Sequence, residues 1–374
     1  MGTGIRRVAA LLGALAGLAA TPAAQAADPF FGILSNGHGL PTAKLTEELD
    51  GQAATGVGLL REHLHWDRIE RSPGSFDWRE TDELVARADA RGMTILPVLV
   101  GTPPFHSTRP SGADTDGWPP RDVATMERFA RELARRYGRR GTFWGCVSPG
   151  FGCRRPYRPI RAWQVWNEPD LKAWWRTGVD PAGYAELLAA ASRGLKRGDR
   201  DAEVVLGGIS LRGLVRGGFL DQLYDRGAAA SFDTLAFHPY AVNVSGVVST
   251  INHARWIASE HGDAGVPIRV TEYGFATGGD REWVTDQKCQ AALIAATTRE
   301  LRARRTELGL RSVVQFSWQD RSNTPATIWP NHAGLLRMDG RPKPALRAFT
   351  EAVADRSPAA GARVADVCDP QHQG

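Results

Sequence analysis

Trp163-Gln164-Val165-Trp166-Asn167-Glu168-Pro169-Asp170 is the stretch that decides the fold of this chain. The apolar and aromatic run at its start predicts a buried strand. Proline cannot continue a strand ladder and also restricts the residue before it, so we expect the strand to stop at Glu168. The sequence therefore fixes a carboxylate at the carboxyl end of a buried strand, with the amide of Asn167 beside it.

A second strand of the same kind lies further along the chain. Ile268-Arg269-Val270-Thr271 runs directly into Glu272-Tyr273-Gly274. Two glutamates at two strand ends are what a retaining glycosidase requires, one as acid/base and the other as nucleophile. The two strand ends therefore predict a pair of carboxylates that work together.

Strand-like and helix-like segments alternate along the chain, which favours a parallel sheet. The expected strands are 30–34, 57–61, 94–100, 162–166, 203–207, 234–237, 267–271 and 312–317. The expected helices are 42–55, 81–90, 121–137, 181–196, 218–228, 252–261, 283–308 and 344–353. Eight successive βα units predict an α/β fold, a single (β/α)8 TIM barrel, whose functional residues lie at the carboxyl ends of the strands.

The ends of the chain differ in character from this alternating region. Arg6 and Arg7 precede the short apolar run Val8–Ala20, and Ala24-Gln25-Ala26 is a small-residue cleavage site. We therefore expect residues 1–26 to be a signal peptide cleaved before Ala27, which makes the mature protein secreted. Since no later run is long and apolar enough to cross a bilayer, we expect no membrane insertion after cleavage. The catalytic domain is expected at 27–355, with a C-terminal tail at 356–374.

Charge and composition narrow the classes of partner. The formal net charge is +5, and the arginines are scattered along the chain and interleaved with acidic residues. This pattern is typical of solvated helix faces and does not indicate a nucleic-acid partner. We expect a monomer without a cofactor.

Four cysteines in an exported chain predict disulfides, for which three pairings are possible. Cys146 and Cys153 bracket a loop rich in Gly, Pro and Ser, so their pairing is locally easy. That pairing leaves Cys289 with Cys368, which would tie the C-terminal tail to the barrel. A metal site is the weaker alternative because the chain has no Cys-x-x-Cys motif.

Asn167-Glu168-Pro169 and the later Glu272 resemble the motifs of the (β/α)8-barrel glycoside hydrolases of clan A, especially families 39 and 5. Family 39 includes β-xylosidases and bacterial exopolysaccharide endoglycosidases. The resemblance spans roughly residues 30–355. It implies a retaining β-glycosidase in which Glu168 is the acid/base and Glu272 the nucleophile. A neighbouring cation would favour the charged form of Glu272, whereas burial and a like charge would raise the pKa of Glu168.

The same resemblance assigns roles to other strand ends. Arg61, at the end of the strand 57–61, is expected to hold the nucleophile, and Asn167 to bind the 2-hydroxyl of the sugar. His238 would line the sugar site, while Tyr240 would donate a hydrogen bond to the nucleophile. Trp318, after the last strand, would be the aromatic platform under the sugar.

Further aromatic residues lie in loops that follow the strands: Trp174, Trp175 and Trp329. Several aromatic rings around one rim suit an extended groove for a poly- or oligosaccharide, although packing of the loops is an equal alternative. The sugar, the linkage and endo or exo action stay open. Arg109, Arg121 and Arg176 keep an acidic glycan possible beside a neutral one.

Two other functions compete with a glycosidase. His63 and His65 share one strand face, the spacing that metal sites use, and His238 and Asp320 could complete a metal-dependent barrel hydrolase. Alternatively, the barrel binds carbohydrate without cleaving it. Such a protein would keep the aromatic residues and lose a carboxylate, whereas both glutamates are present here.

Overall fold

A computed structural model describes residues 27–113, 116–145, 156–280, 284–321, 328–357 and 368. Its main sheet has eight strands, and every pairing between them is parallel. In chain order they are β1 (Asp28–Ser35), β2 (Val57–His65), β5 (Thr94–Val100), β6 (Ala162–Val165), β7 (Glu203–Val205), β8 (Leu235–Phe237), β9 (Ile268–Tyr273) and β10 (Leu310–Gln315). A parallel bridge between Val205 and Thr234 joins β7 to the start of β8, and β10 pairs with β1. The sheet therefore closes into the predicted (β/α)8 barrel.

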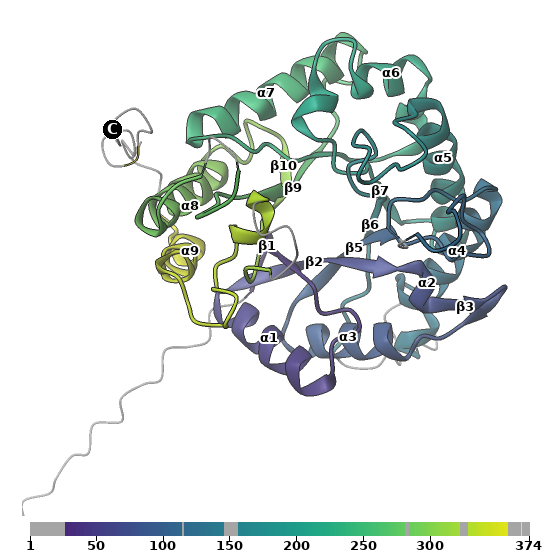
Figure 1. Ribbon diagram of the computed structural model, residues 1–374, viewed down its shortest axis with the longest axis horizontal. Coiled ribbons are helices and arrows are strands. Elements are labelled where there is room, and N and C mark those ends of the chain that lie inside the picture. The colour runs from purple at the N-terminus through teal and green to yellow at the C-terminus, as the bar shows by residue number, and fades with distance from the viewer. Residues whose placement is uncertain are drawn as a thin grey trace, which may run out of the picture.

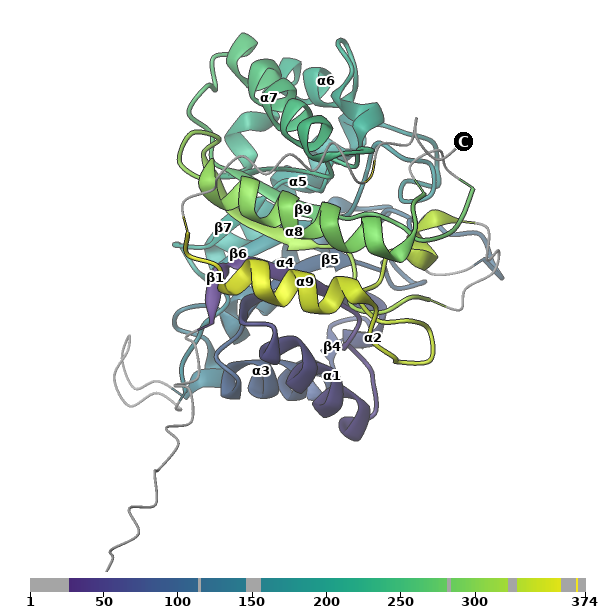
Figure 2. The same cartoon turned by 90° about the vertical axis from the view of Figure 1, so that its left-hand side faces the viewer.

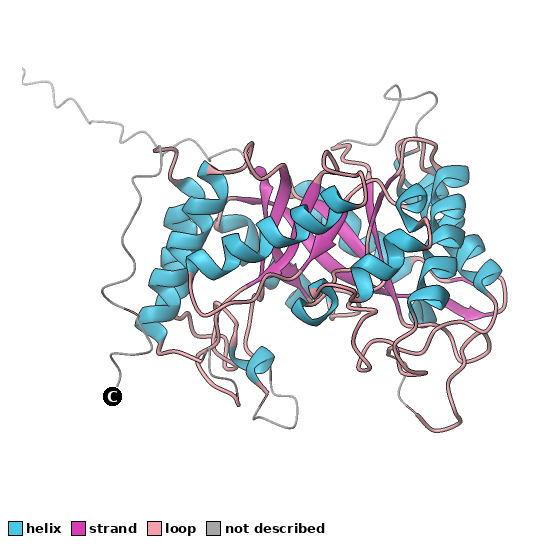
Figure 3. Ribbon diagram, turned by 90° about the horizontal axis from the view of Figure 1, so that it is seen from above, coloured by secondary structure: helices cyan, strands magenta, loops and turns pink. Residues whose placement is uncertain are grey.

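Helices form a ring around the strands (Figure 1). They are α1 (Thr42–Ala54), α3 (Arg79–Ala90), α4 (Val123–Tyr137), α5 (Pro181–Gly198), α6 (Phe219–Asp225), α7 (Val244–Glu260), α8 (Gln287–Ala303) and α9 (Pro344–Ala354). Helices α8 and α9 lie side by side on one flank of the barrel (Figure 2). Seen from above, the strands lie between helices on both sides (Figure 3). The helices thus cover the outer face of the closed parallel sheet.

Alternation along each strand divides the buried apolar residues into two groups. Leu34, Leu59, Leu96 and Val314 belong to a small cluster that fills the inside of the barrel. Their neighbours along the chain, such as Ile33 and Leu60, belong to the larger cluster between the strands and the helices. On β2 the inward positions after Leu59 are Arg61, His63 and His65, because side chains alternate along a strand. The same alternation that packs the core thus carries polar residues toward the carboxyl end of the barrel.

The expected elements are all present, but some boundaries differ. Helix α7 begins at Val244, well before the expected 252, because the side chain of Asn243 accepts from Gly246 N and caps the helix. Helix α8 begins after Asp286, whose side chain accepts from Cys289 N, and ends at Ala303. The expected loop after the second strand contains the short helix α2 (Trp66–Ile69) and the hairpin of β3 (Glu70–Ser72) and β4 (Ser75–Phe76).

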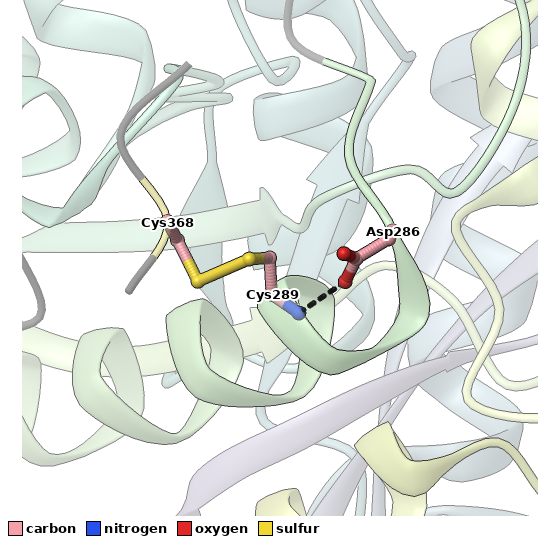
Figure 4. The surroundings of a disulfide bond; sticks show 3 residues. All are labelled: Asp286, Cys289 and Cys368. Carbon is pink, nitrogen blue, oxygen red and sulfur yellow. Dashed lines mark hydrogen bonds between the residues drawn. A yellow bond between two sulfur atoms is a disulfide. The ribbon is translucent and has the colours of Figure 1, made fainter. Parts of the chain in front are cut away.

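One predicted disulfide ties the C-terminal tail to the barrel. Cys289, in the first turn of α8, is bonded to Cys368 with a Cα–Cα distance of 5.4 Å (Figure 4). This pairing is therefore confirmed, whereas Cys146 and Cys153 lie outside the described residues. None of the helices in the described ranges is long and apolar enough to cross a membrane.

Candidate active site

The end of β6 turns Glu168 into the mouth of the barrel. Trp166 and Glu168 both have left-handed backbones, with φ of 70° and 40°. Residues other than glycine adopt this conformation at a cost of about 1–3 kcal/mol each, and such strain gathers at functional sites. Two contacts with the next strand hold the turn in place. Asn167 forms a parallel bridge with Gly208, and Glu168 N donates to Gly208 O at 3.1 Å.

A bulge in β9 orients Glu272. Val270 pairs with Val313 and Tyr273 pairs with Gln315, so two residues of β9 lie opposite one residue of β10. An extra residue of this kind bends the strand and redirects its side chains. Thr271 and Glu272 consequently both contact inward-facing residues, whereas Tyr273 packs outward and bonds Thr298 of α8 at 2.8 Å. Without the bulge, strict alternation would turn Glu272 toward the helices.

Arg61 connects the two strand ends. Its side chain is fully buried, and Nη1 donates to Glu272 Oε1 at 2.6 Å. Nη2 donates to Asn167 Oδ1 at 2.6 Å, and Nε donates to Gln164 Oε1 at 2.8 Å. The guanidinium therefore has an acceptor for each of its three nitrogens, which offsets the cost of burying its charge. The predicted neighbourhood of Arg61, Asn167 and Glu272 is present.

His238 and Tyr240 follow β8 and complete the contacts of the two glutamates. Tyr240 donates from its hydroxyl to Glu272 Oε2 at 2.6 Å. Nδ1 of His238 lies 2.8 Å from Glu168 Oε1 and 3.5 Å from Glu272 Oε2, so the imidazole lies between the carboxylates. His238 is fully buried, and its Nε2 lies against the backbone of Gly208, where a Cβ would overlap the ring. Glycine at this position therefore makes room for the imidazole.

The two carboxylates are close together, and their surroundings shift their pKa values in opposite directions. One oxygen of Glu168, one oxygen of Glu272 and one nitrogen of His238 all lie within 4.8 Å of one another. The pKa of Glu168 is raised, because the effect of burial is larger than the opposite effect of the hydrogen bond from His238. Burial also acts on Glu272, but the charges of His238 and Arg61 and the hydrogen bonds from Tyr240 and Arg61 lower the pKa of that carboxyl. These surroundings therefore favour proton binding by Glu168 over proton binding by Glu272.

After the last strand, the aromatic residue that packs against Tyr240 is Phe316, not Trp318, which the sequence predicted as the platform of the site. The ring of Phe316 lies 6.0 Å from that of Tyr240 and 5.9 Å from that of Trp329. Trp318 is buried instead against α1, where its ring occupies the space beside Gly51. The chain leaves β10 after Gln315, and Trp318 N bonds Leu34 O at 3.2 Å, which carries its side chain to the helix side.

The three predicted rim tryptophans have different environments. Trp329 packs edge-on against Tyr240 at 4.5 Å and therefore lies beside the site. Trp174 is partly exposed and packs against His63 at 5.5 Å, also at this end of the barrel. Trp175 is only 3% exposed and packs against Trp166 and Tyr184, so it is a core residue and its predicted role as a substrate contact is wrong.

The residues proposed for a metal site do not form one cluster. Within the described ranges, one group of three possible ligands lies close together, and it consists of Glu168, His238 and Glu272. His63 and His65 are outside that group. Asp320 instead accepts from Lys343 Nζ and from Gly334 N, both at 2.8 Å. Burial lowers the pKa of His63 most, and the charge of Arg61 lowers it further. The same positive charge disfavours a bound cation.

Comparisons with known proteins find the same fold. No protein-family model matches the sequence, and no curated protein matches it either. A family 39 glycoside hydrolase from Bacteroides cellulosilyticus WH2 superposes with a TM-score of 0.64 at 19% identity, over 88% of this chain and 64% of that one. A GH39 enzyme from Xanthomonas axonopodis pv. citri superposes with a TM-score of 0.64 at 18% identity, over 88% of this chain and 68% of that one. A GH5_18 protein from Streptomyces cattleya superposes with a TM-score of 0.60 at 17% identity, over 89% of this chain and 82% of that one.

These similarities confirm the expected resemblance to families 39 and 5 at the level of the fold, which is a (β/α)8 barrel. The chain spans less than two thirds of the Bacteroides protein. At such low identity, activity has to be argued from the site itself.

Proposed function

We propose that this protein is a retaining β-glycosidase that hydrolyses a poly- or oligosaccharide by double displacement. Glu168 is the acid/base and Glu272 the nucleophile. The observation that carries the proposal is the pair of carboxylates at the ends of β6 and β9, with an oxygen of each within 4.8 Å of the other. Retaining enzymes hold their carboxyl groups about 5–5.5 Å apart, whereas inverting enzymes need about 6.5–9.5 Å to admit a water molecule.

In the first step, a carboxylate oxygen of Glu272 attacks the anomeric carbon while the bond to the leaving oxygen breaks. Glu168 gives its proton to that oxygen, and the sugar remains as an ester of Glu272. Arg61 and Tyr240 orient the attacking carboxylate and keep it ionised before the reaction. Asn167, held by Arg61, is placed to bond the sugar 2-hydroxyl, a contact that strengthens in the transition state.

In the second step, a water molecule attacks the anomeric carbon and gives a proton to Glu168, which is now the base. The ester bond breaks and Glu272 becomes a carboxylate again, so atoms and charge balance over the cycle. His238 contacts both glutamates and remains beside Glu168 while that residue changes charge. No step requires a cofactor.

The site supports hydrolysis better than it supports the alternatives. A barrel that only binds carbohydrate has no need for an arginine that fixes one carboxylate or for pKa values that are driven apart. A metal-dependent hydrolase would need His63 and His65 to ligate beside the cation Arg61. Export of the protein is part of the proposal and rests on the signal-like pattern of residues 1–26.

The test is the release of reducing ends from a panel of β-glucans, xylans, mannans and bacterial exopolysaccharides, with wild type beside Glu272→Ala. We expect the wild type to release ends from at least one glycan and Glu272→Ala to release none above background. Equal release by the two proteins would contradict the assignment of Glu272. Binding of a glycan without any release would instead favour the inactive barrel.

A further inference from the structure

Arg321, in the segment after β10, is a second arginine beside the glutamates. Its guanidinium lies over the ring of Phe316, 5.4 Å from the ring centre. Phe316 in turn packs against Tyr240, which donates to Glu272. These contacts place Arg321 at the same mouth of the barrel, where Glu272 and Arg61 also affect its pKa. Arg321 is therefore close to the sugar that Glu272 would attack.

The guanidinium of Arg321 is partly exposed and has few acceptors among the described residues. Its Nε is inaccessible to solvent, and within the described residues it has no hydrogen-bond partner. The one side-chain contact of Nη2 in that part of the chain is Asn36 Oδ1, at 3.5 Å. Burial lowers the pKa of Arg321, so its surroundings penalise the charge. Arg61, by contrast, donates to three acceptors between 2.6 and 2.8 Å.

Nearby carboxylates already have other partners. Glu272 accepts from Arg61 and Tyr240, and Glu168 accepts from His238. Glu62 is turned toward the backbone N–H groups of Gly37 and His38, at 2.9 and 3.3 Å. The described carboxylates are thus engaged elsewhere, and a carboxylate of a bound molecule would give the guanidinium of Arg321 a charge-assisted partner.

We propose that Arg321 binds a carboxylate on the sugar beside Glu272, so that the substrate is an acidic glycan containing a uronic acid. A guanidinium matches a carboxylate with two parallel N–H donors, and it can do so while its face stacks on an aromatic ring. This inference rests on the proposed glycosidase function and names its class of substrate. If Arg321 only packs against Phe316, it contributes to stability and has no preference among substrates.

The experiment compares each acidic polysaccharide with its own carboxyl-reduced form, in which the uronic acids have become neutral sugars. The panel contains polymers of glucuronic, galacturonic, mannuronic and guluronic acid. The proteins are wild type, Arg321→Gln, Arg321→Lys and Arg341→Gln. Arg341 is the control because it is exposed on a nearby loop and is paired with Asp339 at 2.6 Å. Cleavage rates and binding by calorimetry are measured for every pair, and melting temperatures show which variants fold.

We expect the wild type to cleave one acidic polymer about 100-fold faster than its reduced form, which is the discrimination that an unpaired buried polar group supplies. Arg321→Gln should remove that preference, chiefly through a slower rate on the acidic form. Arg321→Lys should retain part of the preference, since lysine keeps the positive charge and lacks the two parallel N–H donors of the guanidinium. Arg341→Gln should behave like the wild type.

The remaining outcomes separate the two proposals. Equal cleavage of acidic and reduced forms by the wild type, or an equal loss on both in Arg321→Gln, would overturn the role of Arg321 and leave the glycosidase intact. Binding of acidic polymers that depends on Arg321, without cleavage, would keep the site and overturn the glycosidase. If no polymer were cleaved and none were bound, both proposals would be overturned.

Discussion

At the scale of single residues, Arg61 shows how one buried side chain sets the chemistry of a site. It joins β2 to the ends of β6 and β9. Among the described residues its side chain donates hydrogen bonds to Gln164, Asn167 and Glu272. Its charge and hydrogen bond help to lower the pKa of Glu272 against the effect of burial. Glu168, which contacts His238 and no arginine among the described residues, has a raised pKa because burial outweighs the effect of His238. Two chemically identical side chains thereby acquire different roles.

Replacement of Glu168, the proposed acid/base residue, should have an effect that depends on the leaving group. In Glu168→Gln, kcat/KM should fall about 10²–10⁴-fold for glycosides with poor leaving groups, because these need a proton. For a 2,4-dinitrophenyl glycoside, which needs none, the fall should be under about tenfold. Steady-state kinetics on both kinds of substrate check this, with the exposed Glu186→Gln as a control. An equal fall on both kinds would remove Glu168 from the role of acid.

The pH profile should respond to Arg61. The proposed mechanism requires an ionised Glu272 and a protonated Glu168, so kcat/KM should fall below the lowered pKa of the first and above the raised pKa of the second. In Arg61→Gln the pKa of Glu272 rises, so the acidic limb should move to higher pH and the optimum should narrow. The control is Arg79→Gln, whose arginine pairs with Asp77 at the surface. An acidic limb that stays in place would contradict this role of Arg61.

The residues that sequence could predict at the site are those fixed by strand ends. Glu168, Asn167, Glu272 and His238 directly follow or end buried runs, so their position in the barrel follows from the alternation of elements. Phe316 was missed because the chain leaves the strand alternation after Gln315, and no residue type marks that change. Arg321 was missed for a related reason, since its burial over Phe316 depends on loop packing, which one sequence does not encode legibly.

At the scale of elements, α4 and α5 pack closely because two glycines of α5 face α4. A Cβ at Gly194 would overlap the carbonyl oxygen of Glu127, and one at Gly198 would lie 2.5 Å from that of Arg131. The two glycines are four residues apart and so share one face of the helix. Their helix propensity is poor, yet close backbone packing outweighs that cost. The sequence predicted both helices, but it did not indicate this contact.

Gly194→Ala should therefore destabilise the protein although alanine favours helices. The added methyl group meets backbone that cannot move aside, and we expect a loss of about 1–3 kcal/mol in the free energy of unfolding. Gly265→Ala is the matched control, because a Cβ there meets nothing within 4 Å, and it should change stability by less than about 0.5 kcal/mol. Denaturant titration measures both. Equal stability of the two variants would show that α5 moves freely away from α4.

At the scale of the whole molecule, the barrel is closed through β10 and β1 and through the contact of β7 with β8. Closure brings the carboxyl ends of strands far apart in sequence to one rim, which explains how Arg61 and Glu272 meet across 211 residues. Alternating elements predicted this architecture, while the end points of α7 and α8 followed from their capping residues Asn243 and Asp286. The disulfide then fastens the tail to α8.

Loss of that disulfide should lower thermal stability. The bond joins residues 79 positions apart, and closure of so long a loop contributes about 2–5 kcal/mol by restricting the unfolded chain. Cys289→Ser, Cys368→Ser and the double variant should therefore melt at the same reduced temperature, on the order of 5–10 °C below wild type. Calorimetry measures the three transitions. If either single variant melted like the wild type, the tail would not be held by this bond.

The most direct test of a double displacement at Glu272 is to trap the intermediate. The protein is incubated with 2,4-dinitrophenyl 2-deoxy-2-fluoro-β-glycosides of neutral and uronic sugars, and its peptides are analysed by mass spectrometry. Fluorine slows the release of the glycosyl-enzyme while the leaving group favours its formation, so the ester should accumulate. We predict one added sugar, on the peptide that carries Glu272. A sugar on Glu168, or no adduct from a sugar whose ordinary glycosides the protein hydrolyses, would contradict the account.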